Sequence, residues 1–159
     1  MIAALLLLAG AAAGGIADGA GREALGVHGG WGAFRDARPR RCYAIARPSI
    51  AGGRAGGFTS IATWPDRRQR GVLYLRLSRA SAAPVTLSIG ERRFALAARG
   101  QDAWAADGAS ERAIIAAMRS ARSMSVEGVA VGGEPFAEVY ALAGAATAID
   151  AAALACVGR

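Results

Sequence analysis

Lysine does not occur anywhere in the 159 residues, so all 19 basic side chains are arginine. Its absence excludes a lysine Schiff base and a phosphate-binding loop that depends on lysine. Aromatic residues make up 6% of the chain and charged residues 19%, whereas 53% are hydrophobic, which is typical of a globular protein rather than a disordered one. The 12 acidic residues leave a net charge of +7. The chain is therefore a foldable, arginine-rich polypeptide.

Residues 1–20 have the pattern of a secretory signal peptide. An apolar run from Ile2 to Ala17 ends at Asp18, and Gly15 and Ala17 supply the small residues that precede a cleavage site. No Lys or Arg precedes the run, which leaves an uncleaved anchor open, but about 15 apolar residues are fewer than the ~20 that span a bilayer. No later segment is long and apolar enough to span one. We expect export, removal of residues 1–20, and a single domain over residues 21–159.

The chain has only two cysteines, Cys42 and Cys156, near the two ends of the expected domain. An even count in an exported chain predicts a disulfide, although two buried thiols are the alternative. In the chain-entropy model a bridge that closes so long a loop stabilises the fold by roughly 4 to 5 kcal/mol. Two distant cysteines and a single histidine cannot supply the clustered ligands of a structural zinc site. We therefore predict a disulfide and no metal.

Short runs of alternating residues, separated by Gly and Pro, predict antiparallel strands. In residues 72–78 the leucines share one face and the polar side chains share the other, as a half-buried strand requires. Residues 85–89 and 93–96, joined at Gly90, are typical of a hairpin. Further strands are expected over residues 31–35, 41–47, 58–64, 124–131 and 136–142. The predicted fold is mainly β, a small antiparallel β-sandwich or partly open barrel with one or two short helices.

Two segments have helical spacing instead. Residues 110–121 place their apolar side chains on one stripe, with Asp107 or Ser110 available as the N-cap. Thr147, with Asp150 three residues later, resembles a capping box that starts a helix ending near Ala155. Because other large side chains are few, the following aromatic residues are expected to anchor the core: Trp31, Trp64, Trp104, Phe34, Phe58, Phe94, Phe136 and Tyr140.

Several short motifs spread over most of the mature chain together resemble one family. They occur in this order: WGAFRD at residues 31–36, RCYAIA at 41–46, AAM at 116–118, MSV at 124–126, YALAG at 140–144, AIDAA at 148–152, and Cys156. In their order and closing cysteine they resemble the invasion-associated locus B family of exported alphaproteobacterial proteins. The resemblance implies a small periplasmic or envelope protein named for a role in host-cell invasion. It brings no catalytic residues.

A search for catalytic groups finds little. His28, the only histidine, lies among glycines near the start of the mature chain and is expected to be a solvated loop residue. No Gly-x-Ser-x-Gly motif occurs. Glu127 and Glu138 are expected at solvent-facing positions of their strands, in one hairpin region with Glu134. The glycine cluster at residues 52–57 lacks the lysine and the following helix of a phosphate loop. We therefore predict no catalytic residues and no cofactor.

Two groups of arginines are candidates for binding anions. The first group lies beside the first cysteine and the second beside Trp64: Arg38, Arg40 and Arg41, and Arg67, Arg68 and Arg70. If the groups share one face, their guanidinium forks would each bind two anionic oxygens of phosphate or lipid A headgroups, with steep salt dependence. The alternative is a solvated surface of a chain rich in arginine. Export argues against nucleic acid as the partner.

These observations lead to one leading hypothesis about function. It is a non-enzymatic exported envelope protein of the invasion-associated locus B type, located in the periplasm or secreted, that interacts with an envelope or host protein. The alternative is an arginine-mediated binder of lipopolysaccharide or membrane headgroups. An enzyme whose site the sequence does not reveal is a third hypothesis.

Overall fold

The computed structural model describes residues 21–50, 56–82 and 84–157. The signal peptide expected over residues 1–20 and most of the glycine cluster at 52–57 lie outside this part. The described elements are β1 (Arg22–His28), β2 (Trp31–Ala37), β3 (Arg40–Ala46), β4 (Phe58–Trp64), the short 3-10 helix η1 (Pro65–Arg67), β5 (Gln69–Ser81), β6 (Val85–Ile89), β7 (Arg92–Ala105), α1 (Gly108–Met118), β8 (Ser123–Val129), β9 (Pro135–Ala141) and α2 (Ala145–Ala155).

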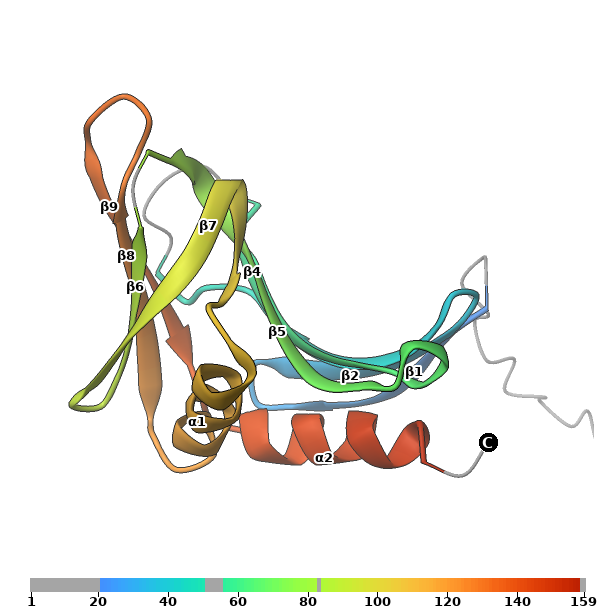
Figure 1. The fold of residues 1–159 in the computed structure, drawn as a ribbon. Helices are drawn as coiled ribbons and strands as arrows, with labels where there is room; N and C mark the ends of the chain where they lie inside the picture. The colour runs from blue at the N-terminus through green and yellow to red at the C-terminus, as the bar shows by residue number, and fades with distance from the viewer. Residues whose placement is uncertain (1–20, 51–55, 83, 158–159) are drawn as a thin grey trace, which may run out of the picture.

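The strands form one antiparallel sheet in the order β1-β2-β3-β4-β5-β7-β6-β8-β9. The sheet is open, with β1 and β9 at its two ends, and two short helices accompany it (Figure 1). The expected mainly β fold with one or two helices is therefore confirmed. The predicted hairpin at Gly90 is also present, since Gly90 has a φ of 59° in the turn between β6 and β7, a value that favours glycine.

The sheet is strongly bent. Figure 1 shows β4 and β5 curving so that one half of each lies beside β1 and β2, above α2, while the other half rises opposite β6, β8 and β9. Isolated bridges join Ile50 to Val139 and Ser81 to Ala130 across this bend. Trp31 adds another link, because its Nε1 donates a hydrogen bond to the Ala141 carbonyl at 2.9 Å. The core lies between the two helices and the side of the sheet that faces them.

Alternation along the strands creates two different faces on the half of the sheet formed by β1 to β5. On β3, Cys42 and Ala44 are buried toward α2, and on β5 the leucines are buried on the same side. Both helices lie against this side, α2 on β1 to β4 and α1 mainly on β5 and β7. The opposite side carries Tyr43 of β3 and Tyr74 of β5, among others, and is called the open face here.

The two helices begin for different reasons. Asp107 caps α1 as predicted, because its Oδ1 accepts hydrogen bonds from the Ala109 and Ser110 amides, each at 2.8 Å. The capping box predicted at Thr147 is wrong, since α2 begins earlier, after Gly144, with no side-chain cap. Gly144 has a φ of 86°, and a Cβ there would lie 2.0 Å from the His28 carbonyl oxygen. This close approach between distant segments fixes the start of α2.

Strand β1 was not predicted, and the expectation that His28 lies in a solvated loop is wrong. His28 ends β1, and its Nε2 is buried without a hydrogen-bond partner in the described part of the chain. The alternation of β1 is interrupted, because the pairing with β2 shifts between Ala24 and Gly26, which explains why its sequence lacks a clear strand pattern.

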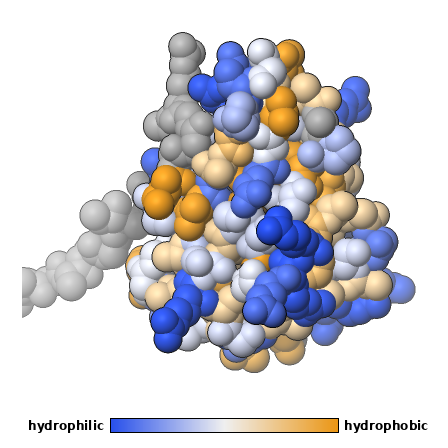
Figure 2. Space-filling model, turned by 90° about the vertical axis from the view of Figure 1, so that its left-hand side faces the viewer, coloured by the Kyte–Doolittle hydropathy of each residue, from blue (hydrophilic) through white to orange (hydrophobic). Residues whose placement is uncertain are grey.

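The surface away from the open face is mixed. Figure 2 shows the side formed by β6, β8 and β9, on which hydrophilic and hydrophobic residues alternate over the face. Within the described residues, neither helix has the length and apolar character that a transmembrane helix needs.

Candidate functional site

Most of the chain's three tryptophans, three tyrosines and four phenylalanines lie on the open face. They come from five strands and occupy alternate positions that pair across the sheet: Phe34, Tyr43, Phe58, Trp64, Tyr74 and Trp104. Phe34 and Tyr43 stack with ring centroids 5.7 Å apart, and Phe58 lies at the same distance from Tyr74. The open face is therefore an aromatic surface on the concave side of the bend (Figure 1).

The prediction that these aromatic residues anchor the core holds for only part of the set. Trp31, Phe136 and Tyr140 are buried in the core. Trp104, by contrast, is 41% exposed, and Trp64 is only half-buried on the open face. Alternation correctly predicted which side chains share a face, but it could not indicate which face the helices cover.

Arginines gather around Trp64 at one end of the open face. The guanidinium carbon of Arg41 lies 5.3 Å from the centroid of the Trp64 ring, and that of Arg67 lies 5.1 Å from it. Arg41 also lies 4.5 Å from the Tyr43 ring, and Arg22 lies 5.9 Å from that ring. Cations over aromatic faces are attracted by the ring quadrupole, so this end of the sheet combines positive charge with aromatic surface.

Asp36 holds two of these arginines. Its Oδ1 accepts from Arg22 Nε at 2.8 Å and its Oδ2 accepts from Arg41 Nε at 2.9 Å. Burial alone would raise the pKa of Asp36, but the hydrogen bonds and charges of Arg22 and Arg41 outweigh it and lower the pKa below its usual value. Burial, followed by the Asp36 charge, raises the pKa of Tyr43, so its hydroxyl stays protonated and able to donate.

A second polar group lies farther along the same face. The Tyr74 hydroxyl donates to Asp102 Oδ1 at 2.6 Å, and Arg76 Nη1 donates to the same oxygen at 2.8 Å. Burial and then the hydrogen bond to Asp102 raise the pKa of Tyr74, whereas the bonds from Tyr74 and Arg76 lower the pKa of Asp102. Here the Asp102 carboxylate matches the charge of Arg76.

Two hollows lie side by side on the open face. One, of about 420 Å³, contains the arginines around Trp64 together with Tyr43 and Tyr74. The other, of about 450 Å³, is lined by Phe34, by Arg47, and by glycines at the start of β2 and before β4. Ile45 and Phe58 line both hollows, so the two are continuous along β3 and β4. Each volume falls in the range of small-molecule sites, about 300–1,000 Å³.

The structure brings together only two of the six arginines predicted to bind anions, Arg41 and Arg67. Arg40 points toward Asp66, with a nitrogen-to-oxygen distance of 4.0 Å. Arg70 lies on the helix side, where it lines a hollow with Arg119 at the end of α1. Arg38 precedes a cis proline in the turn between β2 and β3, and Arg68 ends η1 with a φ of 54°.

Sequence reasoning missed three members of this site: Arg22, Tyr43 and Asp36. Arg22 belongs to the strand that was not predicted. The signal for Tyr43 was available, because Tyr43 follows Cys42 and so must lie on the opposite face of its strand.

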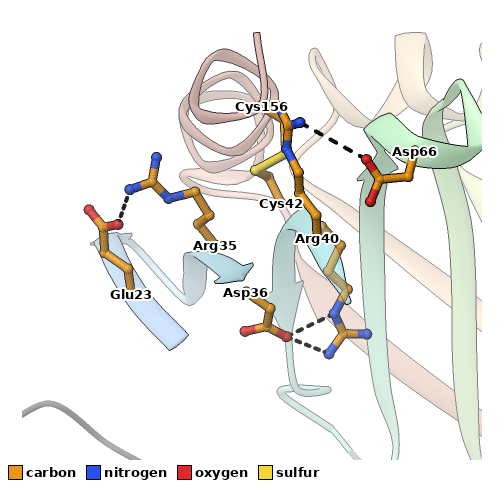
Figure 3. The surroundings of a disulfide bond; sticks show 8 residues. Glu23, Arg35, Asp36, Arg40, Cys42, Asp66 and Cys156 are labelled. Carbon is orange, nitrogen blue, oxygen red and sulfur yellow. Dashed lines mark hydrogen bonds and ion pairs between the residues drawn. A yellow bond between two sulfur atoms is a disulfide. The ribbon is translucent and has the colours of Figure 1, made fainter. Parts of the chain in front are cut away.

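The predicted disulfide is present between Cys42 of β3 and Cys156 after α2, with Cα atoms 5.9 Å apart. Figure 3 shows it on the helix side of the sheet, between the ion pair of Arg40 with Asp66 and the ion pair of Glu23 with Arg35. The bond attaches the end of α2 to β3 on the side of the sheet that both helices cover.

Glu138 does not face solvent as predicted, because it is 0% exposed. Its Oε1 accepts from the Ser78 amide at 2.6 Å and its Oε2 accepts from the Tyr140 hydroxyl at 2.9 Å. The amide of Ser78 lies where the pairing of β5 with β7 is interrupted, so the carboxylate replaces a missing backbone acceptor. Burial, then the charge and hydrogen bond of Glu138, raise the pKa of Tyr140. Glu138 is thus a structural acceptor in the core.

No protein-family model, curated protein or solved structure matches this chain. Its class is defined by its own fold and site. It is a mainly β protein with an open antiparallel sheet, a C-terminal helix attached by a disulfide, and an uncovered face of aromatic and arginine side chains.

Proposed function

We propose that this protein is a non-enzymatic binding protein of the cell envelope that acts through its open face. One observation carries the proposal, namely that a chain poor in aromatic residues places most of them on the face that its helices leave uncovered. Burying a large apolar side chain contributes ~1.5–3 kcal/mol to folding, so leaving several partly exposed forgoes stability. Tryptophan, tyrosine and arginine are also the side chains enriched at binding surfaces.

Export and an envelope location are part of this proposal. The disulfide between Cys42 and Cys156 supports it, because such bonds persist in oxidising compartments. The pattern of residues 1–20 supports it as well. The resemblance to the invasion-associated locus B family is consistent with a small periplasmic or secreted interaction protein, and membership of that family is proposed on its motifs alone.

A second candidate function is binding of anionic envelope surfaces, such as lipopolysaccharide or membrane headgroups, through arginine. The convergence of Arg41 and Arg67 on Trp64 favours it. Its expected signature is retention on anionic vesicles that weakens steeply with salt.

The leading proposal is tested by measuring retention of purified, oxidised protein on an immobilised extract of the native envelope. Trp104→Ser removes an aromatic side chain from the open face, and Leu154→Ser removes an exposed apolar side chain from α2, where Leu154 is 71% exposed. We expect Trp104→Ser to weaken retention about tenfold or more, as truncation of a tryptophan hot spot does. Leu154→Ser should leave it unchanged. Equal retention of wild type and both variants would reject the open face as the binding surface.

A further inference from the structure

Resting on the proposed function, we propose that the two joined hollows of the open face bind one molecule of a single-chain anionic lipid, a long-chain fatty acid. Its carboxylate lies at Arg41 and Arg67, and its hydrocarbon chain lies along Ile45 and Phe58 toward Phe34.

The charged end of the groove carries unmatched positive charge. Arg22 and Arg41 both form ion pairs with the Asp36 carboxylate. Arg67 lies over Trp64 and, in the described part of the chain, forms no ion pair with a carboxylate. The charge of Arg67 is therefore unmatched within the described residues, and a carboxylate from a ligand would pair with it beside Arg41. Guanidinium suits this role, since its fork donates to both oxygens of a carboxylate.

The other end of the groove has a mainly apolar floor, although Arg47 also lines this hollow. Phe34, Ile45 and Phe58 supply an aromatic and aliphatic floor. Glycines at positions 30 and 56 line its rim, and a Cβ added at either would meet no atom within 4 Å. A hydrocarbon chain in this hollow would bury apolar surface at about 25 cal/mol per Å², which is the dominant favourable contribution to lipid binding.

The two ends are continuous and the length between them suits an acyl chain. Trp64 and Phe58 lie at opposite ends of the same strand, β4, and strands advance ~3.3 Å per residue, so the groove extends over roughly 20 Å. Ile45 and Phe58 belong to both hollows and connect them. An anion alone would not use the apolar half, and an uncharged chain would not use the arginines. A single-chain anionic lipid uses both.

Binding is tested with purified oxidised protein and monomeric dodecanoate, measured by calorimetry and by the change in tryptophan fluorescence. Acetate, which has the carboxylate alone, and dodecanol, which has the chain alone, are the paired probes. We expect dodecanoate to bind with one molecule per protein and at least tenfold more tightly than dodecanol. Acetate should not bind measurably. Equal affinity for dodecanoate and dodecanol would overturn the proposal, and so would binding to phosphatidylglycerol vesicles without binding of the monomer.

Matched variants locate the carboxylate. Arg67→Gln removes the unpaired guanidinium over Trp64, whereas Arg92→Gln removes an arginine that lies 4.9 Å from the Phe94 ring on β7, outside the groove. Each lowers the net charge by the same amount. We expect Arg67→Gln to weaken dodecanoate binding about tenfold and to leave the weak binding of dodecanol unchanged. Arg92→Gln should behave as wild type. Equal losses in both variants would indicate general electrostatic attraction and overturn the assigned site.

A second pair locates the hydrocarbon chain. Ile45→Ala truncates the shared floor of the hollows, and Ile115→Ala makes the same change at a half-buried isoleucine of α1 on the opposite face. Only Ile45→Ala should weaken dodecanoate binding, by several-fold. Phe34→Leu is a milder alteration of the same floor, and circular dichroism verifies the fold of each variant. If no variant or wild type binds dodecanoate while envelope retention still depends on Trp104, the lipid ligand is rejected and the proposed function survives.

Discussion

At the scale of single residues, Asp36 connects the fold to the site. Its pKa is lowered in the folded protein, so its stabilising effect is fully present above the unfolded value near 3.8 and is lost as the pH falls through the folded value. We expect the free energy of unfolding to decrease as the pH falls below about 4, and Asp36→Asn to reduce this decrease while costing about 1–3 kcal/mol at neutral pH. Urea unfolding across pH 2–7 measures both effects.

The control for Asp36 is Asp66→Asn, which removes an exposed carboxylate 4.0 Å from Arg40. Exposed pairs at such distances contribute ~0–1 kcal/mol, so neutral stability should barely change. If the free energy of unfolding of Asp36→Asn fell with pH just as that of the wild type does, the ion pairs of Asp36 would not stabilise the fold.

Glu138 gives the strongest residue-scale prediction for stability. Glu138→Ala leaves the Ser78 amide and the Tyr140 hydroxyl without an acceptor in the core, and each unsatisfied donor costs roughly 1–3 kcal/mol. Glu138→Gln keeps an amide oxygen that accepts one of these bonds, so it should cost less than Glu138→Ala. Equal and small losses of unfolding free energy in both variants would contradict this role.

At the scale of elements, local patterns predicted the strands and the first helix well. Alternation in residues 72–78 and the capping residue Asp107 are properties of adjacent residues, and the structure has both features. The start of α2 could not be found this way, because it depends on the contact of Gly144 with the His28 backbone. Strand β1 was hidden by its irregular pairing at Gly26. The start of α2 and the irregular strand β1 therefore depend on long-range contacts, which the local pattern does not show.

The N-cap of α1 provides a test at this scale. Asp107→Ala removes the acceptor for two amides at the start of the helix and should lower the free energy of unfolding by about 1 kcal/mol. Asp107→Asn retains a side-chain oxygen and is the control, with a smaller loss. Chemical denaturation of the wild type and the two variants measures their free energies of unfolding. If Asp107→Asn lowered the free energy of unfolding as much as Asp107→Ala, the charge of Asp107, rather than its hydrogen bonds, would be what stabilises the helix.

At the scale of the whole molecule, the site exists only because distant segments meet. Arg22, Arg41 and Arg67 come from β1, β3 and η1, and no spacing in the sequence indicates that they surround Asp36 and Trp64. The composition suggested arginine-mediated binding, but the grouping by sequence mixed Arg41 and Arg67 with Arg70, which lies on the helix side. Only the covering of one face by α2 distinguishes them.

The disulfide links α2 to the covered side of the sheet. It joins residues separated by 114 positions, so its removal should cost roughly 4 to 5 kcal/mol of unfolding free energy in the chain-entropy model. Reductant should lower the urea midpoint of the wild type and leave that of a Cys42→Ala, Cys156→Ala double variant unchanged. A midpoint of the wild type that does not respond to complete reduction would contradict this account.

The central claim, that this protein binds through its open face, is tested most directly by oxidative footprinting. Hydroxyl radicals would label the accessible side chains of the oxidised protein, alone and bound to its native envelope fraction, and mass spectrometry would measure the oxidation at each residue. The account predicts protection of Trp64, Tyr74 and Trp104 on binding, with Leu154 of α2 labelled equally in both samples. Protection confined to α2, with the three aromatic residues unprotected, would contradict it.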